Sequence, residues 1–302
     1  MDSVNSATLP AGGFVEVLRL LRPHHWTKNL LCLAGVVFSG QYLLGWAVLA
    51  AVETMGVFCA AASAIYVLND LLDRDRDRAH PVKKLRPLAS GAVGVPTAVV
   101  LSVVLVGVAL AGSAALGLPI LVCSGLYLVL NLAYTLWLKH VPLLDVLSIA
   151  LGFVLRMVAG VHVVRELPTA WITLCTFFLS LFLAFTKRRS ELAAQTGTGA
   201  SPRPVLARYT LPFLDHMVAG TGMISVMCYA LFTTTSGKNP ALLVTVPIVV
   251  YGVMHYHRLS SQLELGQEPE RILLKDVRIQ ACLIAWLAVY IAILHFNPQL
   301  FR

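Results

Sequence analysis

Charged residues are scarce in this chain. Asp, Glu, Lys and Arg make up 13% of its 302 residues and hydrophobic residues make up 58%. A typical soluble domain is about 25% charged and about 45–50% apolar. The composition therefore excludes an ordinary soluble domain and indicates a protein that lies in a lipid bilayer.

Several common site signatures are also missing. The 6 cysteines occur singly within apolar runs, without the CxxC spacing of zinc sites or the pattern of a disulfide framework. The sequence has no Gly-rich phosphate loop, no HExxH metal motif and no nucleophilic triad. Residues 1–26 lack the regions of a secretory signal peptide, so none is expected. Any catalytic chemistry must come from other polar groups.

Long apolar runs dominate the sequence. A helix needs about 20 mainly apolar residues to cross a hydrocarbon core about 30 Å thick. Nine runs meet this requirement, near residues 27–45, 46–68, 96–115, 119–138, 143–164, 170–186, 211–234, 240–256 and 278–296. Such runs satisfy their own backbone hydrogen bonds only as helices, whereas a barrel would show short alternating strands. The sequence predicts an all-α polytopic membrane protein with about nine transmembrane helices.

We expect one transmembrane catalytic domain over residues 23–302. The preceding segment, 1–22, is expected to hold a loose tail followed by FVEVLRLLR at 14–22. That stretch suits a helix lying in the membrane interface and ended by Pro23.

Basic residues are distributed unevenly among the predicted loops. All but 4 of the 23 Lys and Arg residues fall on one side of the membrane, which the positive-inside rule assigns to the cytosol. The N-terminus and the catalytic loops are then cytosolic, and Arg302 lies outside. The expected location is a bacterial cytoplasmic membrane. These loops account for the net charge of +8, so no nucleic-acid partner is expected.

The stretch NDLLDRDRDRAHPVKKLRP, residues 69–87, places 4 acids and 6 bases after the second predicted span. If the helix continues, Asn69, Asp73 and Asp77 recur on one face, with Asp70 adjacent. Like charges so arranged repel unless a hard cation lies between them. Mg²⁺ binds one or two carboxylates together with water and phosphate oxygens. The spacing favours a Mg²⁺ site for a diphosphate; the alternative is a solvated juxtamembrane helix whose bases neutralise its acids.

The segment NDLLDRDRDRAHPVKKLRPLASG resembles the first aspartate-rich motif of the UbiA superfamily of intramembrane prenyltransferases. The resemblance implies nine helices around a central cavity open to the cytosol. It also implies that Mg²⁺ is held against a diphosphate leaving group by the expected catalytic and metal-binding residues, Asn69, Asp70, Asp73 and Asp77.

A second charged site, TKRRSEL at 186–192, departs from the family pattern. Most prenyltransferases of the family carry further aspartates after this span. Here the loop from 187 to 210 has Glu191 as its one acid, against the bases Lys187, Arg188, Arg189, Arg203 and Arg208. Bases bind an anion directly, through charge-assisted hydrogen bonds, rather than through a second metal.

In this base-rich loop the sequence resembles the decaprenyl-phosphate phosphoribosyltransferase branch of the superfamily. Other segments resemble that branch: RPHHWTKN at 22–29, YVLNDLLDRDRDRAHPVKKLRP at 66–87, LRMVAG at 155–160 and GQEPERILLKDVRIQ at 266–280. The resemblance implies transfer of 5-phosphoribose from phosphoribosyl diphosphate to a polyprenyl phosphate. The alternatives are a UbiA-type prenyltransferase acting on an aromatic or other small acceptor, and a transporter or lipid-binding protein whose acids bind a cation.

The expected substrate-binding residues are spread over loops and spans: Lys28, Tyr66, Lys83, Lys84, Arg86, Tyr134, Arg156, Lys187, Arg188 and Glu191. Lys83, Lys84 and Arg86 would hold the donor's 5-phosphate or the leaving group. The acceptor phosphate would meet Lys28, Lys187 and Arg188. Self-association into a homo-oligomer is left open by the sequence.

A buried charge needs its own explanation. Arg156 lies in the middle of a span, where a charge costs about 2.5–3.5 kcal/mol on insertion scales. It should therefore face a substrate phosphate in a wet cavity or the polar groups of another helix. Asp145 is too distant along the same helix to pair with it, since eleven residues extend roughly 16 Å.

Overall fold

The computed structural model describes residues 11–80, 82–198, 204–262, 272 and 275–300. Within these ranges the chain is helical, without strands. Eight of the described helices are long and apolar enough to cross a membrane. Their bounds are α3 Gly45–Leu72, α6 Val95–Leu116, α7 Leu118–Leu136, α8 Leu144–Val163, α9 Ala170–Thr198, α10 Leu211–Thr235, α11 Val246–Gln262 and α13 Val277–Phe296. The predicted all-α polytopic fold is confirmed.

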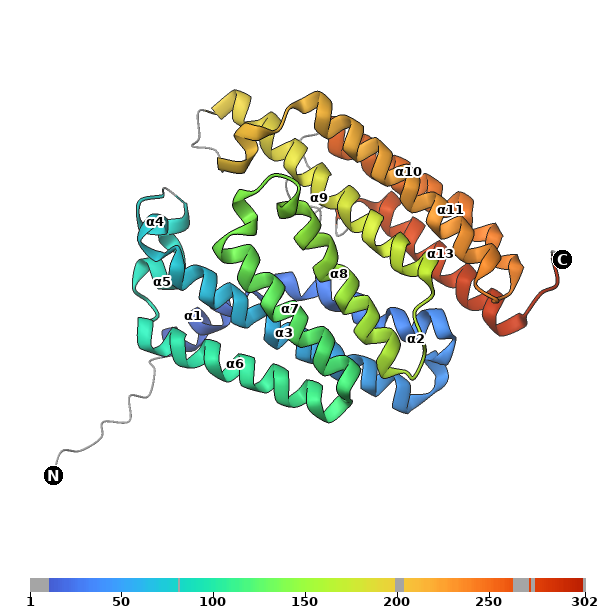
Figure 1. Ribbon diagram of the computed structural model, residues 1–302, viewed down its shortest axis with the longest axis horizontal. Helices are drawn as coiled ribbons and strands as arrows, with labels where there is room; N and C mark the ends of the chain where they lie inside the picture. The colour runs from blue at the N-terminus through green and yellow to red at the C-terminus, as the bar shows by residue number, and fades with distance from the viewer. Residues whose placement is uncertain (1–10, 81, 199–203, 263–271, 273–274, 301–302) are drawn as a thin grey trace.

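The long helices form two neighbouring groups (Figure 1). Helices α3, α6, α7 and α8 make one group, and α9, α10, α11 and α13 make the other. Extensive packing between α8 and α9 joins them. The 3-10 segment η6, Pro240–Thr245, extends α11 at its start. Many side chains on the outer faces of these helices are exposed and apolar, as expected for a surface in contact with lipid.

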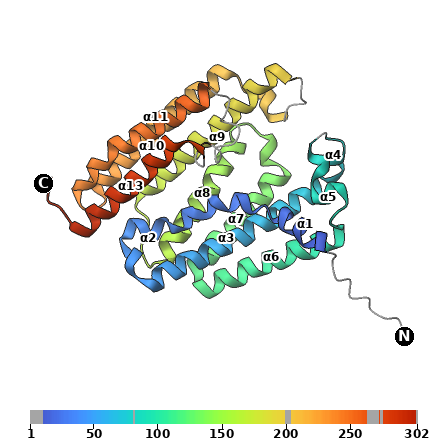
Figure 2. The ribbon, with the colours of Figure 1, turned by 180° about the vertical axis from the view of Figure 1, so that it is seen from behind.

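The first predicted span, 27–45, takes a different form. It consists of the 3-10 helix η1 (Pro23–Leu33), the short helix α2 (Ala34–Ser39) and the turn η2 (Gln41–Leu43). A 3-10 helix rises about 2.0 Å per residue and an α-helix about 1.5 Å. The 11 residues of η1 and the 6 of α2 therefore extend roughly 31 Å, close to the hydrocarbon thickness. Among the described residues, eight helices thus match predicted spans, and the remaining predicted span is a composite segment that leads from α1 to the far end of α3 (Figure 2).

Close backbone contacts join this composite crossing to α8. A Cβ atom on Gly35 would lie 2.0 Å from the carbonyl oxygen of Gly160, and one on Gly160 would lie 2.0 Å from that of Cys32. The composite crossing and α8 therefore touch through their main chains, an approach that requires glycine. A hydrogen bond also joins η1 to α3: Trp26 Nε1 donates to the Ser63 hydroxyl at 3.1 Å.

Replacing Gly160 by Ala should destabilise the protein strongly. The added methyl group overlaps a fixed carbonyl, and such overpacking costs about 1–3 kcal/mol, occasionally more. Thermal unfolding in detergent measures the effect. Gly107→Ala is the matched control, because Gly107 also lies within a spanning helix but has nothing within 4 Å of the added atom. Equal melting temperatures for the two variants would contradict the close approach.

The interfacial helix predicted at 14–22 corresponds to α1, Ala11–Leu21. Leu20 is fully buried and packs with Val67 and Leu88, whereas Phe14 is exposed. Helix α1 lies beside the end of α3 that carries α4 (Figure 2). Arg22 then adopts a left-handed backbone conformation, with φ 53°, which turns the chain into η1 and brings its side chain to that same end.

Candidate active site

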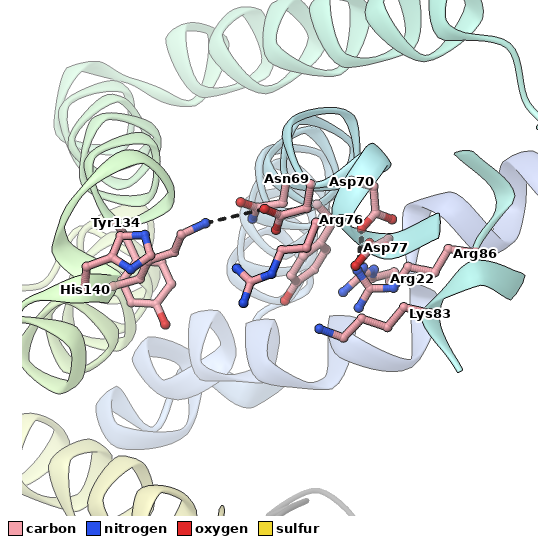
Figure 3. Close-up of a pocket in the computed structure, with 12 residues that line it drawn as sticks. Arg22, Asn69, Asp70, Arg76, Asp77, Lys83, Arg86, Tyr134 and His140 are labelled. Atoms are coloured by element: carbon pink, nitrogen blue, oxygen red, sulfur yellow. Dashed lines mark hydrogen bonds and ion pairs between the residues drawn. The ribbon is translucent and has the colours of Figure 1, made fainter. Parts of the chain in front are cut away.

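A cavity of about 230 Å³ lies at this end of α3 (Figure 3). It is bounded by α4 (Arg74–Arg78), η3 (Lys83–Leu85) and η4 (Leu138–His140), short segments that join the long helices. The described residues that line it are Arg22, Tyr66, Asn69, Asp70, Asp73, Arg76, Asp77, Lys83, Arg86, Tyr134, Lys139 and His140. Every one of them is charged, polar or a tyrosine.

Helix α3 ends at Leu72, but the aspartates on either side of this point keep helical spacing. The backbone N–H of Asp73 donates to the Asn69 carbonyl at 2.9 Å, and that of Asp77 donates to the Asp73 carbonyl at 2.8 Å. The helical hydrogen-bond pattern thus continues through Asp73 into α4. The structure brings Asn69, Asp70, Asp73 and Asp77 together at one cavity.

Two arginines neutralise the buried pair of acids. Asp70 and Asp77 are each 3% exposed. The Arg86 guanidinium donates to Asp70 at 3.1 Å and to Asp77 at 2.6 Å, and Arg22 donates to Asp70 at 2.6 Å. The spacing in the sequence predicts a metal cation among all the acids. In the structure an arginine between Asp70 and Asp77 already offsets their repulsion.

The donor set that remains open suits Mg²⁺. The Asp73 side chain is 36% exposed, and it forms an ion pair with the Lys139 ammonium at 3.9 Å. Among the described residues no group of three His, Cys, Asp or Glu side chains forms a ready metal cluster. Mg²⁺ does not require one, because it binds through one or two carboxylates and completes its shell with water and phosphate oxygens. Asp73 and Asn69 supply such oxygens, with Asp70 and Asp77 adjoining them.

The structure separates the expected substrate-binding residues into two sets. Tyr66, Lys83, Arg86 and Tyr134 line the cavity. The described lining does not include Lys28, Lys84, Arg156, Lys187, Arg188 or Glu191. Most of the segment 266–280 and Arg302 lie outside the described residues.

Arg156 is buried among polar groups of neighbouring elements. Its Nε donates to the Asn29 side chain at 2.6 Å, and its Nη2 donates to the Tyr127 hydroxyl at 2.8 Å. A third bond goes to the carbonyl of Gly152 at 2.9 Å. The sequence predicts that the Arg156 guanidinium faces either a wet cavity or polar groups of another helix. The structure shows the second arrangement, with Asn29 and Tyr127 as partners.

Arg188 is the centre of a buried network. Its side chain is 2% exposed, and it donates to Asp145 at 2.7 Å and to Glu191 at 2.8 Å. Asp145 also accepts from the Tyr209 hydroxyl at 2.7 Å. Burial raises the pKa of Tyr209, so the hydroxyl stays a neutral donor to this carboxylate. Arg188 thus ties α9 to α8, and it reaches the cavity only through its 3.3 Å bond to the Tyr134 hydroxyl.

Replacing Arg188 by Met should lower the free energy of unfolding by about 3–5 kcal/mol, because the fully buried Asp145 carboxylate loses its cation. The neighbouring Arg189 provides the control. It pairs with Asp215, whose side chain is about half exposed, and Arg189→Met should cost no more than about 1 kcal/mol. Chemical denaturation in detergent distinguishes the two variants. Similar losses would mean that the Arg188 network does not hold the bundle together.

Four cavity residues are not among the predicted site residues: Arg22, Arg76, Lys139 and His140. Arg22 was treated as the end of an interfacial helix. Lys139 and His140 follow the fourth predicted span on the same membrane side as the aspartates, which is the one sequence signal that could have found them.

The sequence profile of the UbiA prenyltransferase family matches residues 29–274. Decaprenyl-phosphate phosphoribosyltransferase of Mycolicibacterium smegmatis is 33% identical over 93% of this chain and 93% of its own length. The protein of that name from Mycobacterium tuberculosis is 32% identical, over 95% of this chain and 97% of its own. A solved UbiA homolog from Archaeoglobus fulgidus, bound to DMAPP and Mg²⁺, has a TM-score of 0.70 at 21% identity and covers 93% of this chain and 99% of its own. This chain is a transferase and belongs to the UbiA prenyltransferase family.

Proposed function

We propose that this protein transfers 5-phosphoribose from phosphoribosyl diphosphate to a polyprenyl phosphate of decaprenyl type and releases diphosphate. The chemistry of the cavity residues carries the proposal: each described lining residue is charged, polar or a tyrosine. Such side chains bind phosphate groups through charge-assisted hydrogen bonds. A donor with phosphate groups at both ends of a sugar suits these walls. The relatives named above add support.

The chemistry is a substitution at the anomeric carbon of the donor. The bond from this carbon to the diphosphate oxygen breaks, and a bond to an oxygen of the acceptor phosphate forms. Mg²⁺, held by Asn69 and Asp73 with Asp70 and Asp77 adjoining, would stabilise the charge of the leaving group. Arg76 and Lys83 line the same space and would add charge-assisted hydrogen bonds to it. No general base is needed, because the acceptor phosphate is already an anion.

The sequence assigns the acceptor phosphate to Lys28 and Lys187; neither lines the cavity, and this assignment stays a prediction. The buried pair with Asp145 gives Arg188 a different role, in which it supports the cavity through Tyr134. We further propose that the cavity faces the cytosol of a bacterial cell, with the N-terminus on the same side and the C-terminus outside, because basic residues concentrate on that side.

Purified protein in lipid nanodiscs tests the proposal. With Mg²⁺, labelled phosphoribosyl diphosphate and decaprenyl phosphate, a labelled lipid should appear. Its formation should stop when the metal is chelated and resume when Mg²⁺ is restored. Formation of the lipid at an unchanged rate under chelation would contradict the metal requirement. Absence of the lipid, together with prenylation of an aromatic acceptor from a prenyl diphosphate, would replace the proposal by the alternative activity.

A further inference from the structure

The cavity has two walls of different chemistry (Figure 3). One, here the aspartate wall, combines acids and bases with a tyrosine and an asparagine, from α3, α4, η3 and the residues beside them: Tyr66, Asn69, Asp70, Asp73, Asp77, Arg22, Arg76, Lys83 and Arg86. The other, here the η4 wall, consists of Tyr134, Lys139 and His140. In Figure 3, Tyr134 and His140 stand on one side of the space, opposite Asp70, Asp77 and Arg86.

The η4 wall contributes no carboxylate to the cavity. Its contact with an acid is the 3.9 Å approach of the Lys139 ammonium to Asp73, in which both side chains are partly exposed. Ion pairs of this kind are weak, since solvent screens them and two flexible side chains must be held in place. Lys139 can therefore give up Asp73 for the oxygens of a phosphate, which accept stronger charge-assisted hydrogen bonds.

Buried contacts hold the η4 wall in position. The Tyr134 hydroxyl accepts from Arg188 at 3.3 Å. Just after η4, the backbone N–H of Leu143 donates to the Tyr209 hydroxyl at 2.7 Å, and this hydroxyl donates in turn to Asp145. Both ends of the segment are thus fixed to the buried network around Arg188. A wall fixed in this way presents its groups without first having to be ordered, which favours binding.

We propose that the η4 wall binds the sugar-phosphate end of the donor, a phosphomonoester, without a metal, and that the aspartate wall takes the diphosphate with Mg²⁺. This assignment rests on the proposed function. A diphosphate that shares a metal belongs beside carboxylate and amide oxygens. A single phosphate belongs beside bases that have few carboxylates near them, because like charges repel. Lys83 and Arg86 then serve the leaving group rather than the 5-phosphate.

Binding of two donor fragments tests the assignment independently of turnover. Ribose 5-phosphate, without metal, and inorganic diphosphate, with Mg²⁺, are titrated calorimetrically into the protein in nanodiscs. Lys139→Gln should raise the Kd of ribose 5-phosphate about tenfold or more, as expected for loss of a hydrogen bond to a charged group. The Kd of diphosphate should stay within about twofold, because the variant removes from the aspartate wall only the long, partly exposed ion pair with Asp73.

Two further variants complete the test. Lys83→Gln should show the opposite selectivity, with weaker diphosphate binding and nearly unchanged ribose 5-phosphate binding. Lys238→Gln controls for the change in net charge, because Lys238 lies in the turn between α10 and η6 and is not among the cavity residues. It should leave both dissociation constants unchanged. Retained diphosphate binding by Lys139→Gln also shows that this variant is folded.

Different outcomes overturn the two proposals. If the wild-type protein makes the phosphoribosyl lipid but Lys139→Gln weakens both fragments equally, or only diphosphate, the assignment of the η4 wall is wrong while the function stands. If the wild-type protein makes no such lipid and binds no ribose 5-phosphate, both proposals fail.

Discussion

Replacing Asp73 by Asn should reduce phosphoribosyl transfer by at least about a hundredfold, the scale seen when one preorganised electrostatic group is removed from a transition-state site. Asp73 is the most open of the cavity carboxylates, and the others are paired with arginines at 3.1 Å or less. Asn has the same shape but carries no charge, so it is a poorer ligand for a hard cation. The fold should survive, because the change also reduces repulsion among neighbouring acids.

Asp75→Asn is the matched control for this prediction. Asp75 lies two residues along the chain, its side chain is 79% exposed, and it pairs with Arg74 and Arg78 rather than lining the cavity. Both variants change net charge by the same amount. Rates of lipid product formation at saturating Mg²⁺ should fall only for Asp73→Asn. Equal rates for the two variants would mean that the acidic segment is merely a solvated helix end.

Replacing Arg86 by Gln should lower both the rate of phosphoribosyl transfer and the free energy of unfolding. Arg86 lies between Asp70 and Asp77, and without its charge these two buried carboxylates would face each other with Arg22 as their remaining partner. Breaking a fully buried pair costs about 3–5 kcal/mol. Arg86 is 30% exposed, and solvent screening lowers the expected loss to roughly 2 kcal/mol. Turnover should fall by about a hundredfold or more, since the aspartate wall loses its geometry.

A second substitution separates the two effects of losing Arg86. Adding Asp77→Asn to Arg86→Gln removes one of the facing charges, so the double variant should regain much of the lost stability without regaining activity. Thermal unfolding and product formation, measured on the same preparations, show whether this holds. A double variant that is no more stable than Arg86→Gln alone would contradict the repulsion argument.

Local patterns predicted the parts of the structure that depend on neighbours in the sequence. The helical spacing of Asn69, Asp73 and Asp77 follows from residues four apart, and the structure keeps it through the break at Asp73. The long helices follow from apolar runs, because a lipid-exposed backbone has no other way to satisfy its hydrogen bonds. Bases that closely follow the aspartates, such as Lys83 and Arg86, also reach the same cavity.

Contacts between distant parts of the chain account for the differences. The first crossing meets α8 through Gly35 and Gly160, a contact that no local pattern contains. Arg188 was expected to bind an anion, yet its partner Asp145 lies 43 residues earlier. An unpaired base and a paired base look alike in a sequence. Only the packing of the helices shows which bases are neutralised within the protein and which line the cavity.

A competition between donors tests the central claim most directly. The wild-type protein in nanodiscs is given Mg²⁺, decaprenyl phosphate and an aromatic acceptor, together with equal amounts of phosphoribosyl diphosphate and a prenyl diphosphate. Mass spectrometry of the products identifies which group has moved and to which acceptor. The polar cavity predicts a single main product, decaprenyl phosphate carrying phosphoribose. A prenylated aromatic product with no phosphoribosyl lipid would contradict the account.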